Sequence, residues 1–366
     1  MADPAAAPDA TGLMRQVGDW LSLQIPGTPP IDIRDVVEPT QGFSSRTILF
    51  TAVAARESGW KERSFAARLQ RDVAVPMLSD VFHQYRVMRA IADHSEVKVP
   101  HIEFAEKSGD VIGTPFFLMD RLDGRVPPDF PSYHAEGWFA ETLTAPDRAR
   151  AWSNGVTEME RLHRIDWRAF PFLAPGLEQT PTAVFYLQNF IARWFDWAAQ
   201  GQAFPVIEEA LRFLIANPPP AERAGLVWND ARLGNTMFRP DGTEVVSLLD
   251  FEVATVGPAE IDLAHWLYLD DIFSANFGIA RIAGIPDEEE AISGFERIYG
   301  HKMPYFSYYL AVAALKILIL SVRDYSNGKT MDTPDALPGF LVERLRHYLS
   351  RYADYLATQR KRGLPS

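Results

Sequence analysis

The sequence predicts an α+β protein with two lobes, the first rich in β-strands and the second mainly helical. Of its 366 residues, 47% are hydrophobic, which is enough to bury more than one core. Apolar runs separated by turn residues fill the chain up to about residue 123, which is typical of strands. From Pro146 onward, apolar residues recur at helical spacing. We therefore expect one lobe over 13–123 and another over 124–366.

The first twelve residues, MADPAAAPDATG, are small and proline-rich. They predict a flexible tail and not a signal peptide, because a signal peptide would have a basic start and a long apolar run, and this segment has neither. We therefore expect the protein to stay in the cytoplasm. Next, Leu13 to Leu21 recur at helical spacing, and the segment from Pro26 to Pro30 should end that helix.

The first lobe should contain a meander of strands and one helix. Strand-like runs lie before and after a helical pattern in which Ser79 is the expected N-cap and Gln84 lies in the first turns. The predicted strands occupy 40–55, 64–70, 97–107 and 114–122, and the predicted helix occupies 78–94.

The second lobe should consist of helices, with one exception. The predicted helices occupy 147–166, 182–200, 206–217, 308–322 and 339–359. The most apolar of them, 308–322, is shorter than a membrane span and contains Lys316, so we expect a buried core helix. The exception is 236–250, where a Pro-Asp-Gly turn separates two apolar runs and predicts a hairpin.

Composition excludes several classes of function. The formal net charge of −12 disfavours nucleic acid and anionic membranes as partners, because both reward clustered Lys and Arg. The chain has no cysteine, so disulfides and cysteine nucleophiles are absent. Its eight histidines show no zinc-ligand spacing.

Three polar residues surround the predicted hairpin. Asn235 precedes its first strand and Asp250 ends its second, so the two should meet at one end. A carboxylate and an amide oxygen suit a hard cation such as Mg²⁺. Asp230 lies in the loop just upstream, where a carboxylate could accept the proton of an attacking hydroxyl. The sequence therefore predicts a catalytic base followed by two metal ligands.

These residues resemble the signature of the aminoglycoside phosphotransferase-like family, which is related to choline kinases and has a protein kinase-like fold. The specific stretches are NDARLGNTMF and SLLDFEVATVGPAEIDLAHW. Weaker similarity is carried by QGFSSRTILF, the family's phosphate-covering loop, by GTPFFLMDRLDGRV, its segment between lobes, and by ERLHRID. The resemblance covers roughly residues 30 to 350 and implies an ATP- and Mg²⁺-dependent kinase that phosphorylates a hydroxyl of a small molecule.

The resemblance implies a role for each matching residue. Asp230 corresponds to the catalytic base, and Asn235 and Asp250 correspond to the two magnesium ligands. Asp262 corresponds to a residue that anchors the catalytic loop. The residues implied for ATP binding are Arg68 and Gln84, the backbone amides of Gly42, Ser44 and Ser45, and the backbone of Asp120 and Leu122 beside adenine.

The chain departs from the family at two places, which leaves an alternative open. Trp228 and Asn229 precede Asp230 where the family has His-Gly, and Gln84 replaces a Glu that pairs with the basic residue of the third strand. Gln can still bond a guanidinium, but the ion pair is lost. Asp80 is a possible substitute. The alternative function is a catalytically weak or inactive nucleotide-binding homologue.

The acceptor is left open, since relatives phosphorylate aminoglycosides, amino alcohols and hydroxyacyl thioesters. Asp270 and Asp271 could face a cationic acceptor, although an acidic surface turn is the more common arrangement. Phe190, Trp194, Phe195 and Trp197 could line an acceptor pocket, although aromatic residues at helical spacing more often form core. The sequence assigns no oligomeric state.

Overall fold

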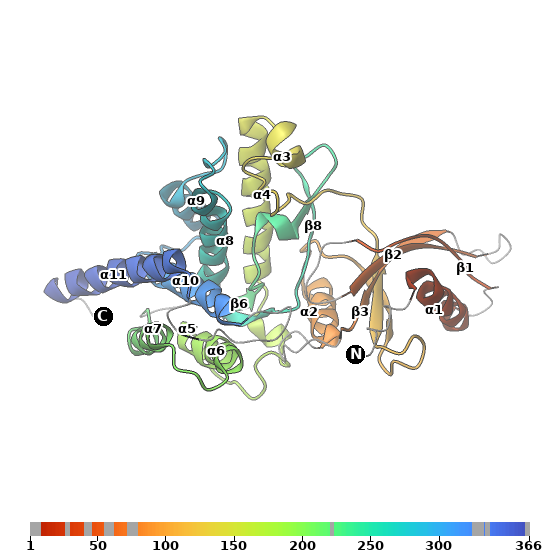
Figure 1. Ribbon diagram of the computed structural model, residues 1–366, viewed down its shortest axis with the longest axis horizontal. Coiled ribbons are helices and arrows are strands. Elements are labelled where there is room, and N and C mark those ends of the chain that lie inside the picture. The colour runs from red at the N-terminus through yellow and green to blue at the C-terminus, as the bar shows by residue number, and fades with distance from the viewer. Residues whose placement is uncertain are drawn as a thin grey trace. The chain divides into compact units, whose positions relative to one another are not determined.

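The computed structural model describes residues 9–25, 30–39, 46–54, 62–71, 80–219, 223–323, 333 and 337–362. Contacts divide the chain into two compact units, one of residues 1–89 and 100–122, the other of residues 90–99 and 123–366. Figure 1 shows strands dominating the first unit and helices the second. The division falls within helix α2, because the end of that helix belongs to the second unit.

The first unit is built on a five-stranded antiparallel sheet with the order β1-β2-β3-β5-β4. The central strand β3 places Arg68 opposite Thr47 of β2 on one side and Phe117 of β5 on the other. The strands are β1 (Asp32–Val37), β2 (Arg46–Val53), β3 (Arg63–Leu69), β4 (Ile102–Glu106) and β5 (Phe116–Asp120).

Helix α1 (Ala10–Gln24) packs on this sheet. Its buried residues, Leu13, Met14, Val17 and Leu21, share one core cluster with residues of β2 and β3. The expectation of a tail up to residue 12 was wrong for residues 10–12, because the side chain of Asp9 accepts hydrogen bonds from the amides of Thr11 and Gly12 and starts the helix early. The helix that the spacing of Leu13 to Leu21 predicted is therefore present and begins at Ala10.

Helix α2 (Val81–His94) follows the predicted pattern but begins with a different cap. The carboxylate of Asp80 accepts from the amide of Phe82 at 2.8 Å and from the Arg86 side chain at 2.9 Å. Asp80 is therefore the capping residue. Ser79, the expected cap, lies outside the described residues.

The second unit is mainly helical, as predicted. Its longer helices after α2 are α4 (Ala145–His163), α6 (Ala192–Ala199), α7 (Pro205–Ala216), α8 (Glu260–Ile272), α9 (Glu288–Tyr299), α10 (Phe306–Val322) and α11 (Gly339–Lys361). Its short helical segments are α3 (Gly137–Glu141), η2 (Trp167–Ala169), α5 (Ala183–Tyr186), η3 (Leu187–Ile191), η4 (Leu233–Asn235) and η5 (Ala275–Phe277).

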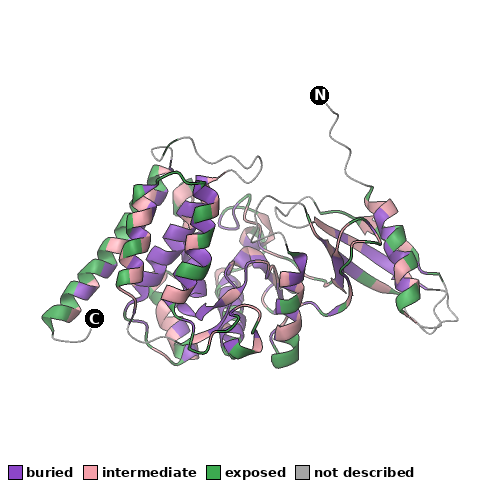
Figure 2. Ribbon diagram, turned by 90° about the horizontal axis from the view of Figure 1, so that it is seen from below, coloured by how far each residue is buried: buried purple, intermediate pink, exposed green. Residues whose placement is uncertain are grey.

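Helix α10 forms the centre of this unit and packs against α8, α11, α7 and α6. Nearly all of its residues are buried, which agrees with the expected core helix. In Figure 2 the buried colour likewise dominates the inner helices of the helical unit. Among the described residues, no helix combines the length and hydrophobicity that crossing a membrane requires.

Two small antiparallel sheets interrupt the helices. Strands β7 (Thr236–Phe238) and β8 (Val245–Leu248) form the predicted hairpin, with Thr236 opposite Leu248. The expectation of one hairpin was incomplete, because β6 (Ala224–Val227) also pairs with β9 (Thr255–Pro258). These four-residue strands are joined through the loop after β6 and the β7–β8 hairpin, so no adjacent turn marks them in the sequence. This pairing holds both ends of the segment 228–254.

Candidate active site

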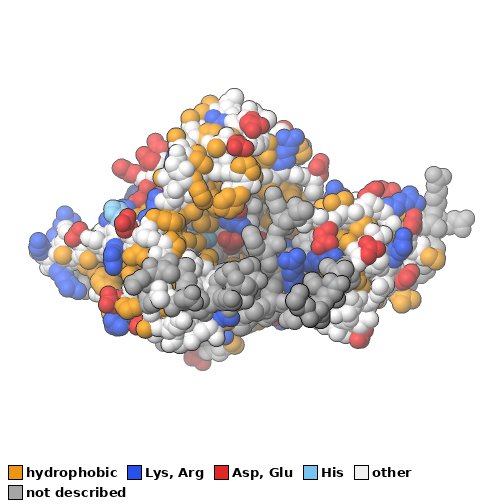
Figure 3. Space-filling view, in the orientation of Figure 1, with side chains coloured by type: hydrophobic (Ala, Val, Ile, Leu, Met, Phe, Trp, Pro, Cys, Tyr) orange, Lys and Arg blue, Asp and Glu red, His pale blue; other side chains and the backbone are white. Residues whose placement is uncertain are grey.

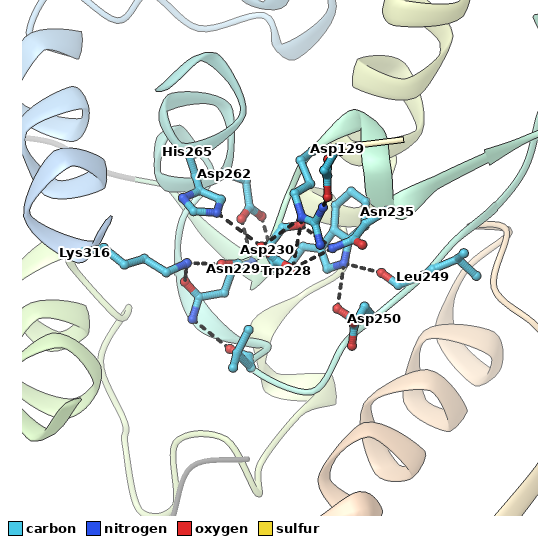
Figure 4. A network of polar contacts seen from close by, with 12 residues as sticks. Asp129, Trp228, Asn229, Asp230, Asn235, Leu249, Asp250, Asp262, His265 and Lys316 are labelled. Carbon is cyan, nitrogen blue, oxygen red and sulfur yellow. Dashed lines mark hydrogen bonds and ion pairs between the residues drawn. The ribbon is translucent and has the colours of Figure 1, made fainter. Parts of the chain in front are cut away.

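Asp230 lies at the centre of a polar network in the loop that follows β6 (Figure 4). Asn235 donates from its Nδ2 atom to the backbone carbonyl of Asp230 at 2.9 Å and to its Oδ2 atom at 2.6 Å. The short η4 turn between the two residues brings them together. His265 of α8 places its Nε2 atom 3.4 Å from the Oδ1 atom of Asp230.

The surroundings of Asp230 raise the pKa of its carboxyl group above its ordinary value. Burial raises its pKa to about 6, against the opposing effects of the Lys316 charge and the Asn235 hydrogen bond. Burial also holds the pKa of His265 well below its usual value, and the nearby charge of Lys316 acts in the same direction. A carboxyl group with a pKa near the working pH is suited to proton transfer.

Asn235 and Asp250 lie at the same end of the hairpin. The amide of Leu249 donates to the carbonyl of Asn235 at 2.9 Å, which places Asp250 beside it. Asp250 has a φ of 62°, a left-handed conformation that is uncommon for residues other than glycine. Its backbone carbonyl accepts from the Trp228 indole at 3.1 Å.

This pair fits the chemistry of a magnesium site. Because the Nδ2 atom of Asn235 is engaged with Asp230, its Oδ1 atom is the one it would present to a cation. One amide oxygen and one carboxylate are hard ligands, which Mg²⁺ accepts together with water and substrate phosphates. Within the described ranges, no group of three or more His, Cys, Asp or Glu side chains is placed to hold a metal ion.

Asp262 of α8 anchors the loop that carries Asp230, as its predicted role required. It is fully buried and accepts from the backbone amides of Trp228 and Asn229, both at 2.7 Å. His163, at the end of α4, lies 2.8 Å from the same carboxylate through its Nε2 atom. Two helices therefore fix the start of the loop through one carboxylate.

Lys316 contacts the loop from α10, a role that the sequence did not predict. Its Nζ atom donates to the backbone carbonyl and the side-chain oxygen of Asn229. Tyr186 donates its hydroxyl to the same side-chain oxygen at 2.8 Å. A single lysine within an otherwise apolar helix was the signal that could have identified it.

Arg232 and Asp129 were also missed. The Nε atom of Arg232 lies 3.3 and 3.4 Å from the two carboxylate oxygens of Asp230, while its Nη1 atom pairs with Asp129. Burial lowers the pKa of Arg232, although the carboxylates of Asp250 and Glu252 act in the opposite direction. The guanidinium is thus held among several carboxylates. Sequence gave no sign of Asp129, which is 103 residues away.

In the first unit, the structure brings Arg68 and Gln84 together. The Nε atom of Arg68 lies 3.3 Å from the Gln84 side-chain oxygen, and its Nη1 atom donates to Thr47 at 2.9 Å. Gln84 is 3% exposed. Asp80 instead bonds Phe82 and Arg86, as described above. The structure therefore contains the expected contact between Arg68 and Gln84, while its role toward ATP stays a prediction.

The segment expected to border adenine lies at the end of β5. The amide of Asp120 donates to the carbonyl of His101, and that of Arg121 to the carbonyl of Ser64, both at 2.9 Å. These two amides therefore already have partners within the unit, and the carboxylate of Asp120 accepts from Arg63 at 2.8 Å. Leu122 is the next residue. Gly42, Ser44 and Ser45 lie outside the described residues.

The acidic pair on α8 does not form a surface turn at Asp270. This residue is 1% exposed, and its carboxylate accepts from the Tyr133 hydroxyl and, at 3.2 Å, from the Trp152 indole. Asp271 pairs with Arg281 and Arg344. The expectation was wrong for Asp270, because α8 is buried on nearly all sides as far as Asp270.

Most of the aromatic group considered for the acceptor belongs to the core. Phe190, Trp194 and Phe195 are all less than 9% exposed. Phe190 packs on both Tyr186 and Trp194. Trp197 instead packs its ring against the guanidinium of Arg323. These contacts agree with the core arrangement that was the alternative to an acceptor pocket.

The β-rich first unit, the helical second unit and the polar loop together define a phosphotransferase with a protein kinase-like fold. The chain belongs to the Phosphotransferase enzyme family, whose model matches residues 35–295. The predicted family, fold class and class of enzyme are therefore confirmed.

Sequence relatives with longer chains share this region. Acyl-CoA dehydrogenase family member 11 of Rattus norvegicus is 25% identical over 263 residues, which are 69% of this chain and 32% of the relative. Acyl-CoA dehydrogenase family member 10 of Mus musculus is 26% identical over 52% of this chain and 17% of the relative. The chain thus spans about a third or less of these proteins.

Solved structures share the fold over nearly the whole chain. A Ralstonia eutropha structure assigned as an aminoglycoside phosphotransferase has a TM-score of 0.65 and 21% identity, covering 94% of this chain and 98% of the other. The aminoglycoside phosphotransferase APH(4)-Ia in complex with ADP and hygromycin B has a TM-score of 0.54 and 14% identity, covering 92% and 98%. Plasmodium vivax ethanolamine kinase has a TM-score of 0.54 and 11% identity, covering 87% and 81%.

Proposed function

We propose that this chain transfers the γ-phosphoryl group of ATP, in the presence of Mg²⁺, to a hydroxyl group of a small molecule. The observation that carries the proposal is the contact between Asp230 and Asn235 at the end of the hairpin that leads to Asp250. One loop thus holds a carboxylate suited to proton transfer next to two oxygen ligands.

In this proposal Asp230 orients the acceptor hydroxyl and receives its proton. The acceptor oxygen forms a bond to the γ-phosphorus as the bond from that phosphorus to the β-γ bridging oxygen breaks, and ADP leaves. Asn235 and Asp250 would hold Mg²⁺, which when bound neutralises phosphate charge. Arg68, supported by Gln84, would hold phosphates of ATP, and Asp120 and Leu122 would border adenine through their backbone.

An exposed aromatic surface beside the loop bears on the acceptor. Phe130 is 67% exposed and Phe277 is 55% exposed, and their rings meet edge to face at 5.9 Å. Phe130 directly follows Asp129, the partner of Arg232. Figure 3 also shows hydrophobic side chains gathered on the surface of the helical unit. This surface favours an acceptor that carries an apolar part next to its hydroxyl group.

The names of the relatives suggest which acceptors to test first. Two of them are acyl-CoA dehydrogenase family members, and this chain matches a limited share of each. A hydroxyacyl thioester would combine a hydroxyl with an apolar chain. The neighbouring structures add hygromycin B and ethanolamine to the panel.

The test is ADP formation from Mg-ATP with each member of this panel, followed by mass spectrometry of the acceptor. We expect one class to give a phosphorylated product that disappears when EDTA is added. Absence of ADP formation with every acceptor and with water would contradict the proposal.

The second candidate is a nucleotide-binding homologue with little or no catalysis. The glutamine at position 84 favours it, because the glutamate that the family has there would bond the Arg68 guanidinium through a charge-assisted hydrogen bond, which is stronger than the neutral one made by Gln84. Such a protein would be stabilised by Mg-ATP or Mg-ADP in thermal unfolding without turning ATP over. Cytoplasmic location stays a prediction from the first twelve residues.

A further inference from the structure

Lys316 is a buried cation at the centre of the most apolar helix. It is 5% exposed, and its neighbours on α10 are almost all buried hydrophobic residues. Taking an ammonium group out of water is costly unless hydrogen bonds and opposite charges compensate for it. The Nζ atom reaches both oxygens of Asn229, the side-chain oxygen at 3.0 Å. Figure 4 shows Lys316 pointing toward the loop that carries Asp230.

Asn229 connects this lysine to the rest of the unit. Its side-chain nitrogen donates to the carbonyl of Val253 at 2.7 Å, and its side-chain oxygen accepts from Tyr186 at 2.8 Å. Its backbone amide donates to Asp262 at 2.7 Å. Every polar group of Asn229 is therefore bonded, and the residue is fully buried.

The backbone conformation of Asn229 explains how these bonds affect the orientation of Asp230. Its φ of 70° lies in the left-handed region, which Asn tolerates better than most residues but less readily than Gly. The carbonyl that accepts from Lys316 belongs to the peptide unit joining Asn229 to Asp230. A bond to that carbonyl fixes the plane of the peptide, and so the direction in which the Asp230 side chain leaves the backbone.

We propose that Lys316 is a positioning residue for phosphoryl transfer, which acts through the carbonyl and side chain of Asn229 to hold Asp230 in its working orientation. This inference rests on the proposed function. Asn229 and Lys316 form a matched pair, because a glycine before the aspartate would offer Lys316, Tyr186 and Val253 no side chain to bind. Where the family has glycine, this chain has Asn229, and Lys316, Tyr186 and Val253 supply the hydrogen bonds that hold it.

The experiment compares Lys316→Met, Asn229→Gly and the double variant with the full wild-type chain. Lys302→Met is the matched control, because Lys302 is an exposed residue that pairs with Glu296 and removing it changes the net charge equally. Two readouts are used: amide hydrogen exchange of peptides covering Trp228–Asn235 in the nucleotide-free protein, and steady-state turnover of Mg-ATP with water or an identified acceptor.

In Lys316→Met we expect exchange in the catalytic-loop peptides to rise at least about tenfold, since local opening costs less free energy, while α11 peptides stay unchanged. We expect kcat to fall by about 10²-fold with little change in KM for ATP, because a displaced group near the reacting atoms slows the chemical step. The double variant should recover part of the kcat that Lys316→Met loses. A glycine at position 229 adopts the left-handed conformation readily and leaves no asparagine side chain without its lysine donor.

Unchanged exchange in the loop of Lys316→Met, or a kcat equal to that of Lys302→Met, would overturn the inference. So would parallel losses in kcat and in exchange protection throughout the second unit, because they would indicate a general structural role. If the wild-type chain turns over no ATP, the proposed function is rejected. If Lys316→Met still shows the localised rise in exchange, the role of Lys316 in holding the loop is supported independently.

Discussion

Gly234 leaves room for the ion pair between Arg232 and Asp129 beside the loop that carries Asp230. A Cβ atom built at this residue would lie 2.8 Å from the Nη1 atom of Arg232 and even closer to the Oδ1 atom of Asp129. These contacts are too short for any real Cβ atom. The ion pair between Arg232 and Asp129 therefore depends on the absence of a side chain at residue 234.

The variant Gly234→Ala should displace this ion pair at a small cost in stability, because the clashing atoms are the ends of flexible side chains. We expect turnover of Mg-ATP to fall by about ten- to a hundredfold, since Arg232 would lose its position against Asp230. Steady-state kinetics and thermal unfolding measure the two effects. Gly339→Ala is the control, since a Cβ atom there meets nothing within 4 Å; equal turnover in both variants would show that the ion pair is dispensable.

For single residues, the sequence predicts only those contacts that join residues close together in the chain. Asp230 and Asn235 were identifiable because one short turn brings residues five apart into contact. Asp129 and Lys316 were not, because they reach the loop from segments 103 and 87 residues away from their partners. Arg232 was inside the quoted motif, yet its pairing could be seen only in the structure.

The strand β6 illustrates how a small element is positioned by a glycine. A Cβ atom at Gly225 would lie 3.0 Å from the carbonyl carbon of His163 and closer still to its oxygen. Because these are backbone atoms at the end of α4, they cannot rotate away. The close approach of β6 to α4 therefore requires glycine here.

Two glycine-to-alanine changes should have opposite effects. Gly225→Ala should destabilise the protein by about 2 kcal/mol or more, because overpacking forces the backbone to shift. Gly294→Ala, within α9, should stabilise it by about 0.5 to 1 kcal/mol, since alanine is the better helix former. Outside the helix's own backbone, the one atom of the described residues within 4 Å of a Cβ there is Nη2 of Arg297 at 3.6 Å. Denaturant unfolding of both variants checks the pair, and equal shifts would contradict this account of β6.

The buried carboxyl group of Asp270 should make stability depend on pH. Burial raises its pKa from 3.8 to about 6, with the charge of Arg281 opposing. The folded protein therefore binds this proton more tightly than the unfolded chain, and its stability falls as pH rises from about 4 to about 6. Asp270→Asn should remove a fall on the order of 3 kcal/mol.

Denaturant unfolding at several pH values between 4 and 7 tests this expectation. The difference in unfolding free energy, wild type minus Asp270→Asn, should decrease up to about pH 6 and stay level above it. Asp354→Asn, at an exposed position of α11, is the control. A difference that does not change with pH would show that Asp270 keeps an ordinary pKa in the folded protein.

Among the elements, those with a local signal were predicted well. The Pro-Asp-Gly turn identified the β7–β8 hairpin, and helical spacing identified α2, α4, α10 and α11. The pairing of β6 with β9 was missed, because four-residue strands far apart in sequence carry too little pattern. Helical spacing also could not reveal that Asp270 faces inward, since α8 is buried on nearly all sides.

For the whole molecule, the order of elements was more informative than any single one. Strands followed by helices predicted an α+β chain in two parts, and both the family match and the solved structures agree. Composition only excluded classes of partner, because a net charge of −12 disfavours nucleic acid and anionic membranes but carries no information about the fold. The acceptor could not be predicted, because residues that form one surface, such as Phe130 and Phe277, come from separate segments.

The most direct test of the central claim is the turnover of Mg-ATP by Asp230→Asn, measured beside nucleotide binding by calorimetry. We expect turnover to fall by about 10² to 10⁴-fold, because the variant cannot accept the hydroxyl proton, while ATP affinity stays near that of the wild type. Asp241→Asn, at an exposed position of the hairpin turn, should behave as wild type. Full turnover in Asp230→Asn would contradict the assignment of Asp230 as the catalytic base.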